Sequence, residues 1–217
     1  MTDTPGNSGQ PITLKGELYR KLIHYSSAAI PIGYFFLEKK ITLTVVIPIL
    51  AAMLIFEILK YNSKSVHALY TKLFSYLLRE HEYDTRRIRI NGATWLLLAD
   101  TICIIAFPKL VAITAMLLLS MADSSSAIVG RVYAKKHYAP NRSFIGSVTF
   151  FVVGVIIVLA APKYFYTPTE YLIGIAAVAG TTIADALNLP ADDNLTIPIV
   201  SSVLLYVLYM FFFPGIF

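Results

Sequence analysis

WLLLADTICIIAFPKLVAITAMLLLSMADSSSAIVGR, residues 95–131, decides the fold, because it holds two apolar runs that only Pro108 and Lys109 separate. A helix of about 20 apolar residues crosses the hydrocarbon core of a bilayer, and shorter helices suffice where protein or long basic side chains cover their ends. The stretch therefore predicts two short membrane spans joined by a tight hairpin. The second span runs directly into Asp123 and a series of small residues.

The remainder of the chain has the same apolar character. Of the 217 residues in the whole chain, 57% are hydrophobic and only 14% are charged, a composition typical of integral membrane proteins. We predict an all-α fold, a polytopic transmembrane helical bundle of about seven spans. The expected spans lie near residues 22–37, 41–59, 92–107, 109–122, 143–161, 169–187 and 196–213.

Three further segments complete the predicted organisation. Residues 1–13 are expected to form a disordered tail, and residues 14–217 a single transmembrane domain. Residues 61–78 carry apolar side chains at helical spacing with basic residues between them, which predicts an amphipathic helix in the membrane interface. This interfacial helix could be an anchor or a lid for a substrate.

The basic residues lie on one side of the predicted bundle. The net charge is +5, yet if the spans alternate, one face holds every Lys and Arg except Lys39, Lys40, Lys109 and Lys163. The positive-inside rule makes the basic face cytoplasmic, together with the N-terminus, and places the C-terminus on the opposite side. The pattern indicates contact with membrane lipids rather than with nucleic acid.

The first span carries a polar stripe where it enters the membrane. Glu17, Arg20, Lys21 and His24 stand at helical spacing and so share one face. Such a stripe can present cations to phosphate oxygens, or it can consist of side chains that reach from a membrane boundary into water. His24 is a candidate base or a hydrogen-bonded core residue.

The fourth span ends in a second polar group. Asp123, Ala127 and Arg131 share a face at four-residue steps, and Lys135 continues the series. Small residues after a carboxylate let a polyanion and a metal approach closely, so Asp123 is a candidate Mg²⁺ ligand. Arg131 is a candidate for bidentate phosphate binding.

The start of the fifth span offers hydroxyls and a glycine. Ser143, Gly146 and Ser147 open a helix whose amides can bind phosphate. The same residues are also typical of helix caps and packing contacts.

Acidic residues surround the start of the last span. Asp185, Asp192, Asp193 and Asn194 form an oxygen-rich cluster on the basic face, which indicates either a metal site or a solvated turn. Asp100, inside the third span, is a further candidate, with structural hydrogen bonding as its alternative.

Taken together, these segments resemble the membrane-embedded CTP-dependent lipid alcohol kinases, namely phytol, farnesol and dolichol kinases, which are related to phosphatidate cytidylyltransferases. The resemblance rests on ELYRKLIH at 17–24, LLREHE at 77–82, NGATWLLLA at 91–99, ADSSSAIVGR at 122–131, RSFIGSV at 142–148 and DDNLTIPIVSS at 192–202. The chain departs from the family pattern at Ala122, where Gly is usual, at Ile145, where Glu is usual, and at Asp185, where many relatives carry Glu.

The resemblance implies transfer of the γ-phosphoryl group of CTP to the hydroxyl of a long isoprenoid or related lipid alcohol, with Mg²⁺ as cofactor. The implied metal ligands are Asp123, Asp193 and Asp192. The implied phosphate-binding and nucleotide-binding residues are Arg20, Lys21, Arg131, Lys135, Ser143, Gly146, Ser147 and Asn194. Asp185 or His24 would accept the alcohol proton.

Two other functions stay open at this point, as does a homodimeric assembly. A cytidylyltransferase would use the same nucleotide and metal but transfer the cytidylate. A transporter or lipid flippase would use Asp100 and Asp185 as ion or proton sites.

Overall fold

The computed structural model describes residues 14–63, 65–69, 90–139, 142–187 and 191–217, with side chains from residue 20 onward. Within these residues the chain is helical, apart from one isolated β-bridge between Ala139 and Arg142. The principal helices are α1 (Leu14–Ser26), α2 (Ala29–Phe36), α3 (Lys39–Asn62), α5 (Gly92–Ala106), α6 (Lys109–Leu117), the π-helical segment η2 (Leu118–Asp123), α7 (Ser124–Tyr133), α8 (Phe144–Ala160), α9 (Pro168–Ala186) and α10 (Asp193–Phe212).

The all-α prediction is confirmed, and most helices lie close to the expected spans, although the expected first span at 22–37 is divided between α1 and α2 by a turn at residues 27–28. The main difference is the fourth span, because α6, η2 and α7 form one continuous helix from Lys109 to Tyr133 instead of ending at residue 122. By length and composition, the helices able to cross a membrane among the described residues are Lys39–Asn62, Lys109–Tyr133 and Asp193–Phe212, while α5 and α8 are shorter apolar helices. The count of about seven spans stays a prediction.

Two expected segments fall largely outside the described residues. The tail at 1–13 does so completely. Of the interfacial helix at 61–78, only the end of α3 and a short helical piece at 65–69 are described.

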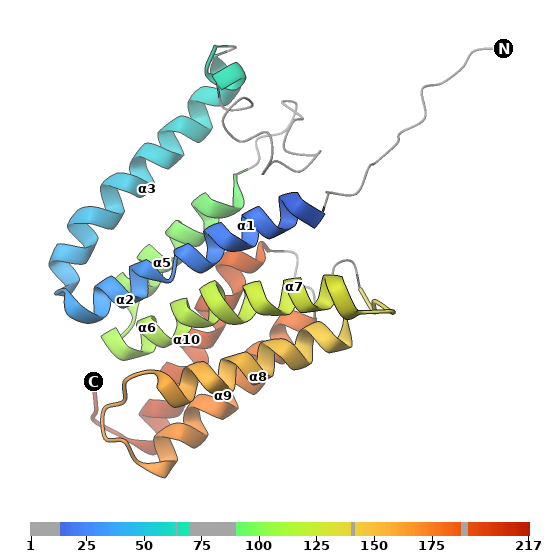
Figure 1. The fold of residues 1–217 in the computed structure, drawn as a ribbon. Helices are drawn as coiled ribbons and strands as arrows, with labels where there is room; N and C mark the ends of the chain where they lie inside the picture. The colour runs from blue at the N-terminus through green and yellow to red at the C-terminus, as the bar shows by residue number, and fades with distance from the viewer. Residues whose placement is uncertain (1–13, 64, 70–89, 140–141, 188–190) are drawn as a thin grey trace.

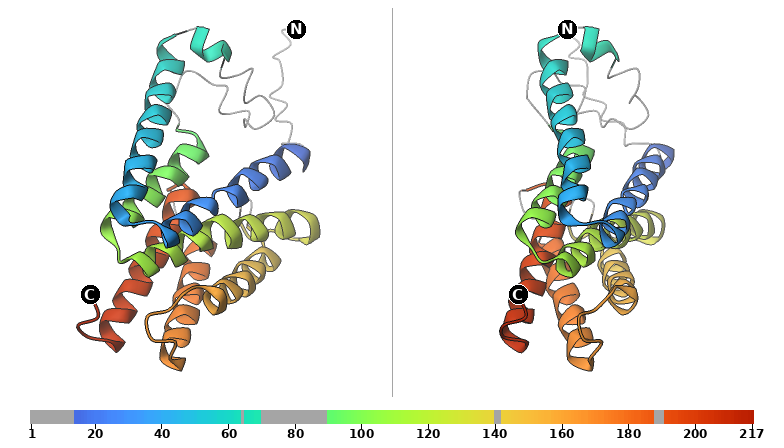
Figure 2. Two further views of the ribbon diagram at one scale, coloured as in Figure 1. Left: turned by 60° about the vertical axis from the view of Figure 1, so that its left-hand side comes forward. Right: turned by 90° about the vertical axis from the view of Figure 1, so that its left-hand side faces the viewer.

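The helices alternate in direction along the chain (Figure 1). One end of the bundle, called here the site end, is where α1, α5, α8 and α10 begin and where α3, α7 and α9 finish. In the main body α10 packs against α9 and α5, α8 packs against α7 and α9, and α1 crosses η2 and α7. Figure 2 shows α3 standing apart from this body, with its contacts made mainly to α5.

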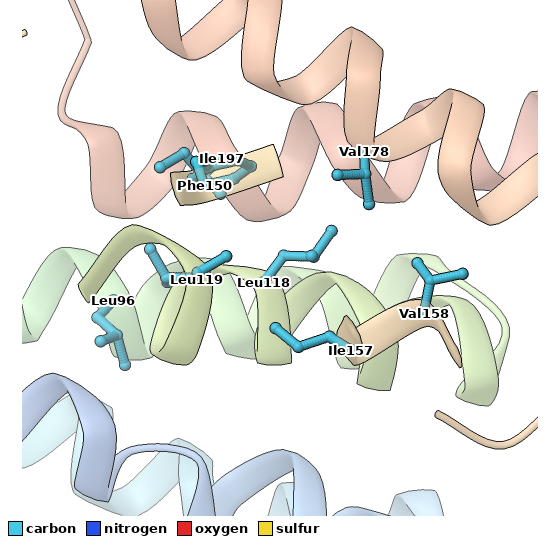
Figure 3. Close-up of a cluster of buried hydrophobic side chains, with 9 residues drawn as sticks. Leu96, Leu118, Leu119, Phe150, Ile157, Val158, Val178 and Ile197 are labelled. Atoms are coloured by element: carbon cyan, nitrogen blue, oxygen red, sulfur yellow. The ribbon is translucent and has the colours of Figure 1, made fainter. Parts of the chain in front are cut away.

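The core of the main body is a cluster of branched apolar side chains around η2 and α8 (Figure 3). Leu118 and Phe150 are completely buried within it. Two glycines let α8 and α9 approach closely: a Cβ on Gly154 would lie 2.6 Å from Val178 Cγ1, and a Cβ on Gly174 would lie 2.4 Å from a methyl of Val158. Small residues at helix crossings are the usual means of close packing where lipid replaces water as the solvent.

The segment η2 gives the long helix one wider turn that ends at Asp123. Ser120 and Asp123, both in this turn, are buried, and the hydroxyl of Ser120 lies 2.9 Å from that of Ser27 in the bend between α1 and α2. A π-helical turn changes which side chains face a neighbouring helix and often occurs at functional sites. Here it holds a carboxylate against α1.

At the opposite end of the bundle, charged side chains satisfy backbone groups. Lys109 donates to the carbonyl of Leu37 at 2.9 Å. The buried carboxylate of Glu170 accepts hydrogen bonds from the backbone N–H groups of Tyr164 and Phe165 and from the hydroxyl of Tyr209. These side chains satisfy backbone groups in loops and at helix ends, because buried backbone polar groups need hydrogen-bond partners.

Candidate functional site

A buried ion pair joins α1 to η2 at the site end. Lys21 Nζ donates to Asp123 Oδ2 at 2.8 Å, and both residues are less than a tenth exposed. Tyr25, one turn further along α1, shares a 2.6 Å hydrogen bond with the Ser125 hydroxyl and supports the same helix crossing. Because burying two charges is costly unless they are well paired, this pairing fixes the position of both groups.

Arg142 joins two further carboxylates. Its side chain is buried, and its two terminal nitrogens bind Asp185, in the last turn of α9, and Asp193, the first residue of α10. The backbone of Arg142 is anchored by its hydrogen bonds with Ala139 and Tyr138 in the link between α7 and α8. One planar guanidinium therefore joins the α7–α8 link to the end of α9 and the start of α10, more than 40 residues further along the chain.

The guanidinium of Arg142 remains positively charged. Burial opposes that charge, but the neighbouring carboxylates of Asp185, Asp193 and Asp123 outweigh it and raise the pKa of the guanidinium above its ordinary value. The positive charge is therefore present at every pH at which the protein is folded.

These contacts form one ionic network, defined as Lys21, Asp123, Arg142, Asp185 and Asp193. Asp123 interacts electrostatically with Lys21, His24 and Arg142, and Asp185 interacts with Asp123 and Asp193. The structure therefore brings together acids from η2, α9 and α10 with cations from α1 and the α7–α8 link. In the described part of the chain, no group of three or more His, Cys, Asp or Glu side chains is arranged to hold a metal ion.

Asn194 and Arg20 lie beside this network at the start of α5. A Cβ on Gly92 would lie 2.9 Å from Asn194 Nδ2 and 3.5 Å from Arg20 Nη2, so only glycine fits there without displacing them. Asn91 caps α5 by accepting from the Ala93 N–H at 2.9 Å. The predicted nucleotide-binding roles of Arg20 and Asn194 are compatible with this position and stay predictions.

Asp192 has a different position from its two acidic neighbours. Its carboxylate accepts from the backbone N–H of Asn194 at 3.0 Å and so caps α10, whereas Asp193, which is also exposed, binds Arg142. Asp185, which the sequence suggested as a base, shares the Arg142 guanidinium with Asp193 instead. Asp185 and Asp193 are therefore the better candidates for a pair of metal ligands. A ligand role for Asp192 stays a prediction.

The Ser143 and Gly146 pair has a clear structural role. Ser143 Oγ accepts from the Gly146 N–H at 3.2 Å and caps α8. A Cβ on Gly130 would lie 3.0 Å from the same oxygen, which shows how closely α7 approaches the start of α8. The Ser147 hydroxyl lies 2.8 Å from that of Tyr138. The alternative of caps and packing therefore describes the contacts made here, and the predicted phosphate cradle is not tested.

Three other candidates lie outside the network. Arg131 and Lys135 are exposed near the end of α7. Asp100 is completely buried in α5, and neither of its carboxylate oxygens has a hydrogen-bond partner among the described residues.

Sequence reasoning missed Arg142 as a site residue. Its signal was present, because a basic residue directly precedes the cap of a membrane helix at the predicted cytoplasmic face. The choice between this arginine and the others nearby could not be made without knowing that α9 and α10 bring their acids to it.

Comparison with known proteins extends this description. A CTP-dependent diacylglycerol kinase of Schizosaccharomyces pombe is 30% identical over 166 residues, covering 70% of this chain and 74% of the yeast protein. The CTP-dependent diacylglycerol kinase of Saccharomyces cerevisiae is 28% identical, covering 87% of this chain and 72% of its own length. An uncharacterized protein of Rickettsia prowazekii is 27% identical over 84% of this chain and 90% of its own length. No family model matches the sequence, and no solved structure does.

The fold and the network define a helical protein with apolar, membrane-length helices and a largely buried cluster of acids and cations at one end, in which only Asp193 is exposed. The chain belongs to the family of CTP-dependent lipid kinases to which these diacylglycerol kinases belong.

Proposed function

We propose that the chain is an integral membrane kinase that transfers the γ-phosphoryl group of CTP to the hydroxyl of a lipid alcohol. The observation that carries the proposal is the ionic network, because it gathers three carboxylates and two cations from five separate parts of the fold. Phosphoryl transfer requires mainly the positioning of reactants and the neutralisation of phosphate charge. The network has the residues for both tasks.

For the acceptor we put diacylglycerol first, since three relatives carry the name of CTP-dependent diacylglycerol kinase. The long isoprenoid alcohol that the sequence suggested is the second candidate. Both are primary lipid alcohols or contain a primary hydroxyl, and the charged side chains of the network suit phosphate groups and do not distinguish between lipid tails. The acceptor must therefore be decided by assay.

The roles within the network follow from charge and position. Lys21 and Arg142, with Arg20 beside them, bind the oxygens of the triphosphate. Asp185 or His24 accepts the proton of the alcohol as its oxygen attacks the γ-phosphorus. The bond between that phosphorus and the bridging oxygen to the β-phosphate breaks, and CDP leaves.

The residues present fit a magnesium ion that arrives with the nucleotide. Mg²⁺ in phosphoryl-transfer sites is usually held by one or two carboxylates together with phosphate oxygens and water, and a cage of three protein ligands is not needed. Asp185 and Asp193 both bind the Arg142 guanidinium, and we assign them to the ion once that side chain binds the triphosphate. When bound there, Mg²⁺ would neutralise charge on the triphosphate, and Asp123 is the next carboxylate within reach.

The membrane orientation is part of the proposal. The site end carries the excess of Lys and Arg and is cytoplasmic by the positive-inside rule, with the C-terminus on the other side. The exposed face of α3 is lined by apolar side chains, such as those of Val45, Ile55 and Ile58, which suit contact with lipid tails. The lipid acceptor would enter sideways from the bilayer, with its hydroxyl at headgroup level.

The test is an assay of purified protein in lipid nanodiscs with CTP labelled either at the γ-phosphate or in the cytidine. Diacylglycerol, geranylgeraniol and a polyprenol are offered in parallel, and ATP replaces CTP in a second series. We expect label in the lipid product only from γ-labelled CTP. Label from cytidine would instead indicate a cytidylyltransferase, and no labelled lipid with any acceptor would refute the proposal and favour the transporter hypothesis.

Two variants make this assay specific to the network. Asp123→Asn should lower the rate by at least about a hundredfold, because it removes a charge from the centre of a site that works by electrostatic positioning. Lys136→Gln changes the charge of an exposed residue of the α7–α8 link and should leave the rate within about twofold of the unchanged protein. An Asp123→Asn protein with the full rate would contradict the assignment of the network as the reaction centre.

A further inference from the structure

The Arg142 guanidinium lies between the two carboxylates that we assign to the metal ion. It is buried between Asp185 and Asp193 and is bound to one oxygen of each. These are the carboxylates best placed to share a divalent ion. The protein therefore carries its own cation at this point.

That internal cation stays charged, because arginine is not deprotonated in proteins. It can only be displaced. Its backbone is held on one side by the bridge to Ala139 and on the other by the Ser143 cap of α8. The movable part is consequently the long side chain, which can swing while its Cα stays in place.

Displacement has a cost that depends on what else is bound. A buried guanidinium that leaves two carboxylates needs other anionic oxygens, because an unpaired buried charge is strongly unfavourable. The triphosphate of a nucleotide supplies such oxygens, and arginine binds phosphate in the same planar, two-point manner as it binds carboxylates. A metal ion alone supplies none.

We propose that Arg142 is an internal counter-cation that keeps the Asp185 and Asp193 pair closed to a divalent metal until a nucleoside triphosphate draws its guanidinium away. This inference rests on the proposed function and deepens it, since it assigns a binding order to the same site. Metal and nucleotide then bind with positive cooperativity, because each removes an obstacle to the other. The arrangement also prevents the empty site from holding a metal ion unproductively.

The experiment measures Mn²⁺ binding by the loss of its free electron paramagnetic resonance signal, with and without a non-hydrolysable CTP analogue. We compare the unchanged protein with Arg142→Gln, Arg142→Lys and the control Lys136→Gln. Without nucleotide, Arg142→Gln should bind Mn²⁺ at least about tenfold more tightly than the unchanged protein, because a repelling charge at contact distance is removed. Arg142→Lys, which keeps the charge but can bind only one acid at a time, should fall between the two.

The cooperativity provides a second measurement. In the unchanged protein the CTP analogue should tighten Mn²⁺ binding at least about tenfold, and in Arg142→Gln this effect should shrink to within about threefold. Thermal unfolding of each variant establishes that it is folded, and if Arg142→Gln does not fold, the comparison of Arg142→Lys with the unchanged protein decides the matter. The Lys136→Gln protein should bind Mn²⁺ like the unchanged one.

Equal or weaker Mn²⁺ binding by Arg142→Gln, or by Arg142→Lys where that variant decides, would overturn the inference, as would the absence of Mn²⁺ binding in every variant. Failure of this inference is distinct from failure of the proposed function. An active kinase with unaltered metal binding in the Arg142 variants would retain the function and lose the counter-cation. A protein with no kinase activity but a tighter metal site in Arg142→Gln would refute the proposed function and retain the counter-cation.

Discussion

The pair of Lys21 and Asp123 allows a quantitative test of how the site end is held together. At a separation of 2.8 Å, an effective dielectric constant of about 20 gives an attraction of about 6 kcal/mol. Removing two charges from water opposes this by several kcal/mol per ion. We therefore expect a net coupling between the two side chains of about 2–3 kcal/mol.

The perturbations are Lys21→Met, Asp123→Asn and the double variant. Lys21→Met leaves a buried carboxylate without its closest cation and should lower the free energy of unfolding by about 3 kcal/mol. Asp123→Asn should lower the free energy of unfolding by less, about 1 kcal/mol, because the long side chain of Lys21 can extend toward water. The double variant should cost about 1 kcal/mol, less than the sum of the two single changes.

The assay is reversible unfolding in mixed detergent micelles, followed by circular dichroism and analysed as a double-mutant cycle. Lys136→Met, at an exposed position, serves as the matched control and should change stability by less than about 0.5 kcal/mol. A coupling below about 0.5 kcal/mol would show that the effects of the two changes simply add. The buried pair would then not be what fastens α1 to η2.

Two further predictions concern the packing that supports the site. Gly174→Ala places a methyl group 2.4 Å from Val158 Cγ1 and should lower the free energy of unfolding by about 1–3 kcal/mol, measured by the same unfolding assay, whereas Gly33→Ala, with nothing within 4 Å, should not destabilise. Equal effects of the two alanines would refute the close packing of α8 on α9. Glu170→Gln loses a charged acceptor of two backbone N–H groups and the Tyr209 hydroxyl and should cost about 2–3 kcal/mol, while its Mn²⁺ affinity, measured with and without nucleotide, should match that of the unchanged protein. A change in metal affinity as large as that in Arg142→Gln would show that the far end of the bundle acts on the site.

Much of the fold could be predicted from the sequence because apolar runs and helix-breaking residues are local signals. The helix boundaries at Pro108 and at the caps Asn91 and Ser143 are of this kind. The continuation of the fourth span to Tyr133 was not predicted, since Asp123 and the following serines interrupt the apolar run. Tertiary pairing with Lys21 and Tyr25 compensates for those polar groups and lets the helix continue.

Lys21, Asp123, Asp185 and Asp193 were candidates from the sequence, whereas Arg142 and the pairing of these residues were not predicted. The sequence indicated which acids and cations gather at one end, because they all lie at one predicted membrane face. It could not indicate that Arg142 would bind both Asp185 and Asp193, since residues 142, 185 and 193 are brought together only by the packing of α8, α9 and α10. It also could not separate Asp192, which caps α10, from Asp193 beside it.

Ile145, where the family pattern that the sequence resembles has glutamate, has a defined position in the structure. Ile145 lies in the first turn of α8 with an exposed fraction of 38%, whereas the adjacent Gly146 is buried against α7. A glutamate there would start from the surface side of the helix, while the network obtains its carboxylates from η2, α9 and α10. Two of those acids share the single charge of Arg142, so a further carboxylate close by would add repulsion unless another cation came with it. The isoleucine is therefore compatible with the proposed reaction centre, in which Asp123, Asp185 and Asp193 would supply the negative charge opposite the metal and the lysine and arginine side chains.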